Sequence, residues 1–196
     1  MVMTSSLSIF FATILTHNIA LTYILGMCPT IGLSKNTKTA MGMGISVVFV
    51  ITLTSLVNWP IYNLILVPTG SKVLSLLVFI VTIAATVQLL EMLLEKFAPA
   101  LHSAFGIFLP LITVNCTVLA VSLFMVLRDY NLFHTLVFAL GSSIGWLLAI
   151  TLVAGIREKL DLIGDIPKGL DGAGIVMVIL GILALGFMGF SGMVDL

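Results

Sequence analysis

Six long apolar runs decide what this chain is able to fold into. They cover approximately residues 5–26, 42–67, 73–95, 99–126, 133–156 and 172–193. A helix needs about 20 apolar residues to cross the ~30 Å hydrocarbon core of a bilayer, and each run supplies them. Only 8% of the residues are charged, whereas soluble domains carry roughly a quarter. The sequence therefore predicts an all-α integral membrane protein with six transmembrane helices.

The segments between these runs are short and polar. They contain Lys35–Lys38, Pro68–Lys72, Glu95–Lys96, Arg128–Asn131 and Arg157–Asp171. The net charge is zero, so the chain has no basic face for nucleic acid. It also has no glycine-rich nucleotide loop and no recognisable catalytic triad. We expect a single membrane domain, residues 1–196, that is surrounded by lipid, binds no nucleic acid and catalyses nothing alone.

The basic residues are divided unevenly between two sets of loops. Cytoplasmic loops of membrane proteins are enriched in Lys and Arg. Here the loops after spans 1, 3 and 5 hold Lys35, Lys38, Lys96, Arg157, Lys159 and Lys168, and the loops after spans 2 and 4 hold Lys72 and Arg128. This distribution predicts that both termini face the outer side of the membrane.

The two halves of the chain resemble each other around its only two cysteines, Cys28 and Cys116, since a serine follows each at the same spacing. Each half, about 1–98 and 99–196, contains three predicted spans, and a repeat with an odd number of spans is inverted in the membrane. The first and fourth spans also contain helix-disrupting residues, namely Gly26, Pro29, Gly32, Gly106 and Pro110. We therefore expect two inverted three-helix repeats, with discontinuous helices 1 and 4 carrying the cysteines.

Cys28 and Cys116 are the strongest candidates for chemistry. They supply half of the four thiolates that a 2Fe–2S cluster normally takes from protein, so a second, similar subunit would have to supply the rest. One alternative is that each cysteine is a small apolar filler of a membrane helix. Another is a disulfide, which we disfavour because buried intramembrane thiols lack an exchange partner. On these grounds the cluster and filler interpretations both remain open.

Two polar residues inside the predicted spans are further candidates. Glu91 lies near the cytoplasmic end of the third run, and a carboxylate at membrane depth is costly enough to indicate an ion path. The structural alternative is that Glu91 reaches the interface or pairs with Lys96. Asn115 precedes Cys116, and its amide is placed to donate to cluster sulfur; the alternative is a bond between helices.

Several longer motifs resemble one family. They are Leu25–Pro29, Thr39–Gly44, Gly106–Cys116, Gly155–Glu158 and Gly186–Gly192. Over nearly its full length the chain resembles the membrane subunits of Rnf complexes and of Na⁺-translocating NADH:quinone reductases (NQR). Thr39–Gly44 is similar to the Rnf A protein, whereas Arg128–Asn131 and Gly145–Ile150 are closer to its counterpart NQR E. We favour Rnf A and keep NQR E as the alternative.

This resemblance implies a subunit of an ion-translocating oxidoreductase of the inner membrane, a ferredoxin:NAD oxidoreductase in the Rnf case. Paired six-helix subunits of the family share one intramembrane 2Fe–2S cluster, to which each gives two cysteines. Cys28 and Cys116 match these ligands, and the sister protein, Rnf E or NQR D, would supply the others. The cluster would relay electrons to a covalently bound FMN, coupled to Na⁺ or H⁺ translocation. The other Rnf proteins, B, C, D and G, would be further partners.

A secondary transporter or channel is the alternative from another class, because inverted repeats with broken helices are also the plan of transporters. It makes the two cysteines dispensable, whereas the redox interpretation makes both indispensable. A purely structural assembly protein would leave the broken cysteine helices unexplained.

Overall fold

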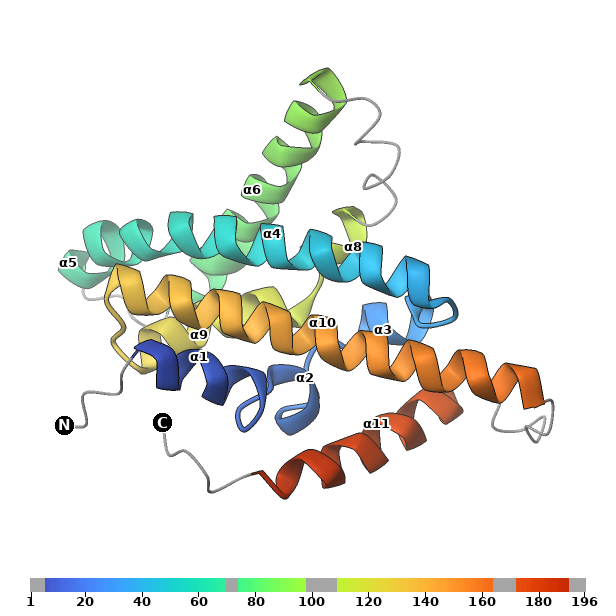
Figure 1. Ribbon diagram of the computed structural model, residues 1–196. Coiled ribbons are helices and arrows are strands. Elements are labelled where there is room, and N and C mark those ends of the chain that lie inside the picture. Colours follow the sequence, from blue (N-terminus) through green and yellow to red (C-terminus); the bar gives the residue numbers. More distant parts are fainter. Residues whose placement is uncertain (1–5, 70–73, 98–108, 164–171, 191–196) are drawn as a thin grey trace.

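The computed structural model describes residues 6–69, 74–97, 109–163 and 172–190, in which all the regular structure is helical. The helices are α1 (Ser6–Ile14), α2 (Ile19–Thr22), α3 (Met27–Leu33), α4 (Thr37–Ile61), η1 (Tyr62–Leu66), α5 (Val67–Thr69), α6 (Ser75–Phe97), α8 (Leu109–Thr113), α9 (Cys116–Leu127), α10 (Leu132–Ile163) and α11 (Ala173–Met188). The stretch η1 is a π-helix that continues α4 without a break. Figure 1 shows these elements in space.

Hydrophobic length accounts for the long helices. Within the described ranges, four stretches are long and apolar enough to cross a membrane: Thr37–Leu66, Ser75–Leu93, Pro110–Leu127 and Leu132–Ile163. α11 is apolar but shorter. The expectation of an all-helical, multi-pass membrane protein is therefore confirmed. The number of six spans stays a prediction, because parts of the predicted runs, including 98–108 and 191–196, lie outside the described residues.

The first predicted span, 5–26, is not one helix. Its residues are divided between α1, α2 and the segment that leads into α3. The breaks also differ in position from those expected, because Pro29 lies in the first turn of α3 and Pro110 in the first turn of α8. Proline is tolerated there, since the first N–H groups of a helix have no partner within the helix.

α4 and α10 form the centre of the fold. They lie side by side and run in opposite directions, with α1 and α11 on the far side of α10 (Figure 1). The pair encloses side chains that are fully or almost fully buried, among them Val47 and Ile51 of α4 and Trp146 and Ile150 of α10. α1 packs on α10, and α9 packs on α4.

Glycines on α10 allow α1 to approach closely. A Cβ at Gly141 would lie 2.0 Å from Thr13 Oγ1, and one at Gly145 would lie 3.1 Å from Asn18 Nδ2. Asn18 uses this space, because its Nδ2 donates to the carbonyl of Gly145 at 2.9 Å. Its Oδ1 accepts from the N–H of Ala20 at 3.0 Å and so caps α2. Small residues at helix contacts of this kind are typical of membrane bundles.

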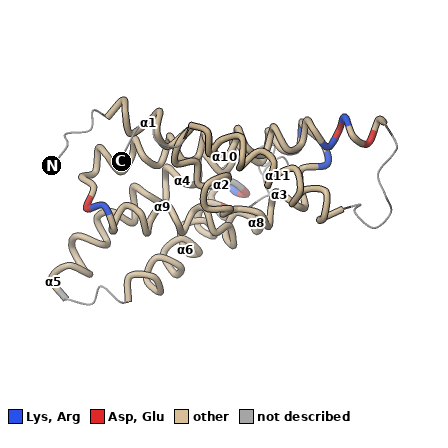
Figure 2. The backbone as a smooth tube through the Cα atoms, turned by 90° about the horizontal axis from the view of Figure 1, so that it is seen from below, with Lys and Arg blue, Asp and Glu red and all other residues tan. Residues whose placement is uncertain are grey.

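Charged residues gather mainly at the two ends of the bundle (Figure 2). At the end where α10 finishes, Arg157 is only 5% exposed. Its Nη1 donates to Ser34 Oγ at 3.1 Å and to the carbonyl of Ile31 at 3.3 Å. The next residue, Glu158, accepts a hydrogen bond from the hydroxyl of Thr37, the first residue of α4. These hydrogen bonds link the end of α10 to α3 with its C-cap and to the start of α4.

α6 is the least enclosed of the long helices. Among its described side chains, the buried ones form a narrow stripe of Phe79, Ile83 and Val87. These residues follow one another at four-residue spacing and so lie on one face. Figure 1 shows the far end of α6 projecting away from the other helices.

Candidate cysteine site between two broken helices

The first cysteine follows a glycine that ends an irregular segment. Gly26 has a φ of 84° and a ψ of 24°, a left-handed conformation that other L-residues adopt only under strain. α3 begins directly after it, and Cys28 is the second residue of this helix. The side chain of Cys28 is exposed. The glycine thus turns the chain so that a cysteine at the start of α3 faces outward from the protein.

The second cysteine begins a helix after a break. α8 ends at Thr113, and Asn115 is the N-cap of α9, with its Oδ1 accepting from the N–H of Thr117 at 3.1 Å. Cys116 is the first residue of α9 and is partly buried. The N-terminus of a helix carries a partial positive charge from its unpaired N–H groups.

The two cysteine segments meet although they are far apart in the sequence. The N–H of Gly26 donates to Cys116 Sγ at 3.0 Å. A Cβ on Gly26 would lie 2.3 Å from both Thr117 Oγ1 and Trp146 Nε1. No residue larger than glycine fits between these side chains without a shift, so this contact needs glycine for space as well as for its φ.

Three buried polar groups lie around this contact without a hydrogen bond to any described residue. They are Asn115 Nδ2, Thr117 Oγ1 and Trp146 Nε1. Their residues are at most 2% exposed. A buried polar group left unpaired costs about 1–3 kcal/mol. Two of the three are N–H donors, and the described residues offer them no hydrogen-bond acceptor.

The thiols set the limits of what the chain can bind by itself. Both are free, so the described residues contain no disulfide. No group of three or more His, Cys, Asp or Glu side chains in the described part of the chain is arranged to hold a metal ion. Two thiolates are half of the four that a 2Fe–2S cluster takes. Any cluster here would need ligands from another polypeptide, and the exposed thiol of Cys28 is open to one.

The other predicted site residues are in different places. Asn115 caps α9 through its Oδ1, and its Nδ2 has no partner among the described residues, so its role as a donor to a ligand stays a prediction. Glu91 is half-buried and lies near the end of α6. Among the described residues, no hydrogen bond or ion pair joins Glu91 to the cysteine segments, and its role in an ion path stays a prediction.

Two residues of the site were missed by reasoning from the sequence. Thr117 and Trp146 are next to Gly26 only because α9 and α10 fold against the first break. A tryptophan in a long apolar run has no local feature that distinguishes a site residue from a core residue. Only the tertiary contact identifies it.

The fold and this site together define a class: a multi-pass α-helical membrane protein with two thiols at helix breaks. Residues 6–194 match a family model described as "Rnf-Nqr subunit, membrane protein". The chain belongs to the Rnf-Nqr family, as the motifs in its sequence predict.

Named relatives cover almost the whole chain. One from Maridesulfovibrio salexigens is 47% identical and aligns with 94% of this chain and 96% of its own length. One from Methylococcus capsulatus is 48% identical, with coverages of 97% and 98%. One from Alcanivorax borkumensis is 49% identical, with coverages of 95% and 96%. All three are named as the E subunit of the Na⁺-translocating NADH-quinone reductase.

Proposed function

We propose that the chain is a membrane subunit of an ion-translocating electron-transport complex, in which Cys28 and Cys116 supply two of the four ligands of a 2Fe–2S cluster. The bond from the Gly26 N–H to Cys116 Sγ carries this proposal. It brings both cysteine segments together, close to the buried N–H groups of Asn115 and Trp146 that have no partner among the described residues. When bound, the cluster would supply one-electron redox chemistry within the membrane.

The residues present fit such a group. Thiolates and the sulfides of a cluster are electron-rich acceptors, and hydrogen bonds to them raise the reduction potential. Gly26 donates from its backbone, and the amide of Asn115 and the indole of Trp146 are donors without another partner among the described residues. The start of α9 adds a partial positive charge. These groups would hold and orient the ligand, with Cys28 and Cys116 as its thiolate ligands.

The choice between the two related complexes rests on the relatives. Sequence motifs favour Rnf A, but the relatives described above carry the name of the NQR E protein at 47–49% identity. Their names favour the NQR alternative and, with it, Na⁺ as the coupled ion. Both assignments give this chain the same task and the same two ligands, and in neither does it catalyse a reaction without its partners.

The proposal includes an inverted pair of repeats in the inner membrane, with both termini on the outer side. α4 and α10, which would be equivalent, run antiparallel (Figure 1). Asn18 and Asn115 each cap a helix that follows a break. A sister protein with the same plan, NQR D or Rnf E, would present its own two cysteines to the exposed thiol of Cys28.

Low-temperature EPR with iron and sulfide analysis on this protein, purified with its complex, tests the proposal. Cys28→Ser and Cys116→Ser should each remove a 2Fe–2S signal and stop electron transfer. Met177→Ser is the matched control, because it removes an exposed sulfur-containing side chain of α11 that is not part of the site. A fully active complex with either cysteine replaced would instead support the transporter or channel alternative.

A further inference from the structure

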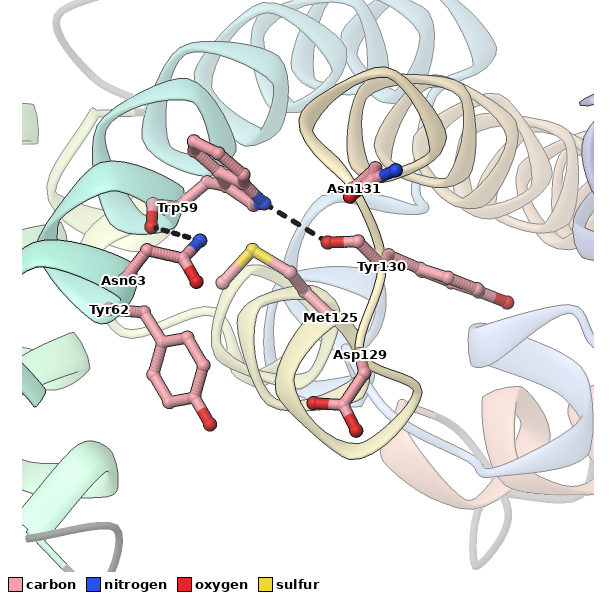
Figure 3. A pocket seen from close by; sticks show the side chains of 7 residues that line it. All are labelled: Trp59, Tyr62, Asn63, Met125, Asp129, Tyr130 and Asn131. Carbon is pink, nitrogen blue, oxygen red and sulfur yellow. Dashed lines mark hydrogen bonds between the residues drawn. The ribbon is translucent and has the colours of Figure 1, made fainter. Parts of the chain in front are cut away.

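The chain contains two tryptophans, and their indole N–H groups differ in one respect. Trp59 Nε1 donates to the carbonyl of Tyr130 at 3.0 Å (Figure 3). Trp146 is 0% exposed, and its Nε1 has no hydrogen-bond partner among the described residues. A buried indole N–H usually finds a partner, because leaving it unpaired costs free energy. Trp146 therefore has a donor that the described part of the chain does not use.

The unpaired donor of Trp146 lies beside the contact between the cysteine segments. Gly26 connects the two, because its N–H bonds to Cys116 Sγ at 3.0 Å and the place of its absent Cβ is 2.3 Å from Trp146 Nε1. Thr117 Oγ1 is equally close to the same point, yet no hydrogen bond joins it to the indole. The indole nitrogen thus lies against a residue that donates to the cysteine sulfur.

Contacts on both sides of Trp146 hold the indole in this place. The carbonyl of Gly145 accepts from Asn18 Nδ2 at 2.9 Å. Leu147 packs on Gly44 of α4, where a Cβ would lie 2.8 Å from Leu147 Cγ. A donor fixed in this way by its surroundings needs no reorganisation when negative charge develops beside it.

The acceptor that would satisfy Trp146 has to lie next to Gly26 and Cys116, where the proposed cluster would be held. The sulfur atoms of an iron–sulfur centre accept hydrogen bonds, and these bonds help to set its reduction potential. Reduction adds one negative charge to the centre. A nearby N–H donor therefore stabilises the reduced form more than the oxidised form.

We propose that the indole N–H of Trp146 donates to a sulfur atom of the centre that Cys28 and Cys116 hold, and that this bond raises its reduction potential. The inference rests on the proposed function, because it needs a one-electron centre at the two thiols. The electron comes from the donor of the electron-transport complex, and the indole keeps its proton. α10, a helix that carries neither cysteine, thereby sets how readily the centre accepts an electron.

An EPR-monitored redox titration of the whole purified complex tests the inference. Trp146→Phe keeps an aromatic ring and removes the N–H. The ratio of reduced to oxidised centre at a fixed potential should fall about tenfold, which is the value of one hydrogen bond to a charged group. For a one-electron couple this corresponds to a midpoint potential lower by about 59 mV. An unchanged midpoint in an assembled Trp146→Phe complex overturns the inference.

Two control variants separate the lost N–H from other effects of the substitution. Trp59→Phe makes the same chemical change at an indole that is bonded to a backbone carbonyl. Ile150→Val removes a methylene group from the buried side of α10, about one turn beyond Trp146. Both should leave the midpoint unchanged. A shift in either control equal to that of Trp146→Phe would show that packing, and not the N–H, sets the potential.

A spectroscopic measurement covers the case in which Trp146→Phe does not assemble. Pulsed EPR on the reduced wild-type complex, with ¹⁵N in the indole rings of its tryptophans, should detect a ¹⁵N coupling to the centre. The coupling should persist in Trp59→Phe and be absent from Trp146→His. No coupling in the wild type, or one that persists in Trp146→His, overturns the inference.

The same samples distinguish failure of this inference from failure of the proposed function. A normal 2Fe–2S signal with an unchanged midpoint in Trp146→Phe refutes only the role of Trp146. A wild-type complex without a 2Fe–2S signal refutes the cluster and, with it, this inference.

Discussion

Replacing Gly26, the N-cap of α3, by alanine should disrupt the cysteine site more than adding a methyl group at any position within α3. The new Cβ would lie 2.3 Å from Trp146 Nε1 and from Thr117 Oγ1, and 3.0 Å from Trp146 Cδ1. Real Cβ atoms essentially never make contacts this short, so the indole, the hydroxyl or the turn itself has to move. Because the Gly26 N–H bonds to Cys116 Sγ, a displaced turn also loses that bond.

The expected cost follows from two separate effects. A left-handed φ of 84° costs alanine about 1–2 kcal/mol relative to the right-handed region. Forcing an extra methyl group into a packed site costs about 1–3 kcal/mol more. Their sum of roughly 2–5 kcal/mol is a large part of the 5–15 kcal/mol that typically separates folded from unfolded domains.

Gly32 offers a matched control within the same helix. A Cβ there meets no heavy atom within 4 Å, and alanine is a better helix former than glycine by up to about 1 kcal/mol. Gly32→Ala should therefore be neutral or slightly stabilising. The assay is the thermal unfolding midpoint of the purified complex, combined with its iron content and EPR spectrum. Equal midpoints and identical spectra for Gly26→Ala and Gly32→Ala would refute the reasoning.

Two further predictions concern the contacts that fix α10. Arg157→Gln should destabilise the complex by about 2–4 kcal/mol, because it removes charged hydrogen bonds and leaves buried acceptors on α3 and its C-cap unpaired; Lys159→Gln, at an exposed neighbour, should stay within about 0.5 kcal/mol of the wild type in the same melting experiment. Gly141→Ala should cost about 1–3 kcal/mol by pressing on Thr13 Oγ1, and adding Thr13→Ala should recover much of that loss. Strictly additive effects of the two substitutions would contradict a direct contact.

The sequence predicts the long helices well because the length of an apolar run is a local property. α4 begins five residues before the run 42–67 and η1 ends one residue before the end of that run. α10 begins one residue before the run 133–156 and ends seven residues after it. The polar segments at Lys35–Lys38 and Arg128–Asn131 do separate helices. Helix ends inside apolar runs are harder to predict. Asn18 breaks the first run by capping α2, whereas Pro29 and Gly32, which the sequence pattern marks as interruptions, lie within α3.

The cysteine site was predictable only in part. Counting two cysteines in matching contexts selects the pair of segments that meet, and Asn115 follows from its place before Cys116. The partners of Gly26 do not follow, because Trp146 and Thr117 reach it through packing between helices that are distant in sequence. The π-helix η1 could not be predicted either, because no hydrophobic pattern encodes its geometry.

The contacts of α3 fix the distance between the cysteine site and the charged end of the bundle. α3 is held at both ends by the same helix, since Trp146 packs on the glycine before it and Arg157 bonds to its last turn. Residues 146 to 157 of α10 cover about 16 Å at 1.5 Å per residue, which is about half the ~30 Å thickness of the hydrocarbon core. A single straight helix therefore sets how far the thiols lie below the charged end of the bundle, and a residue inserted between these two anchor points would rotate and shift one of them relative to the other.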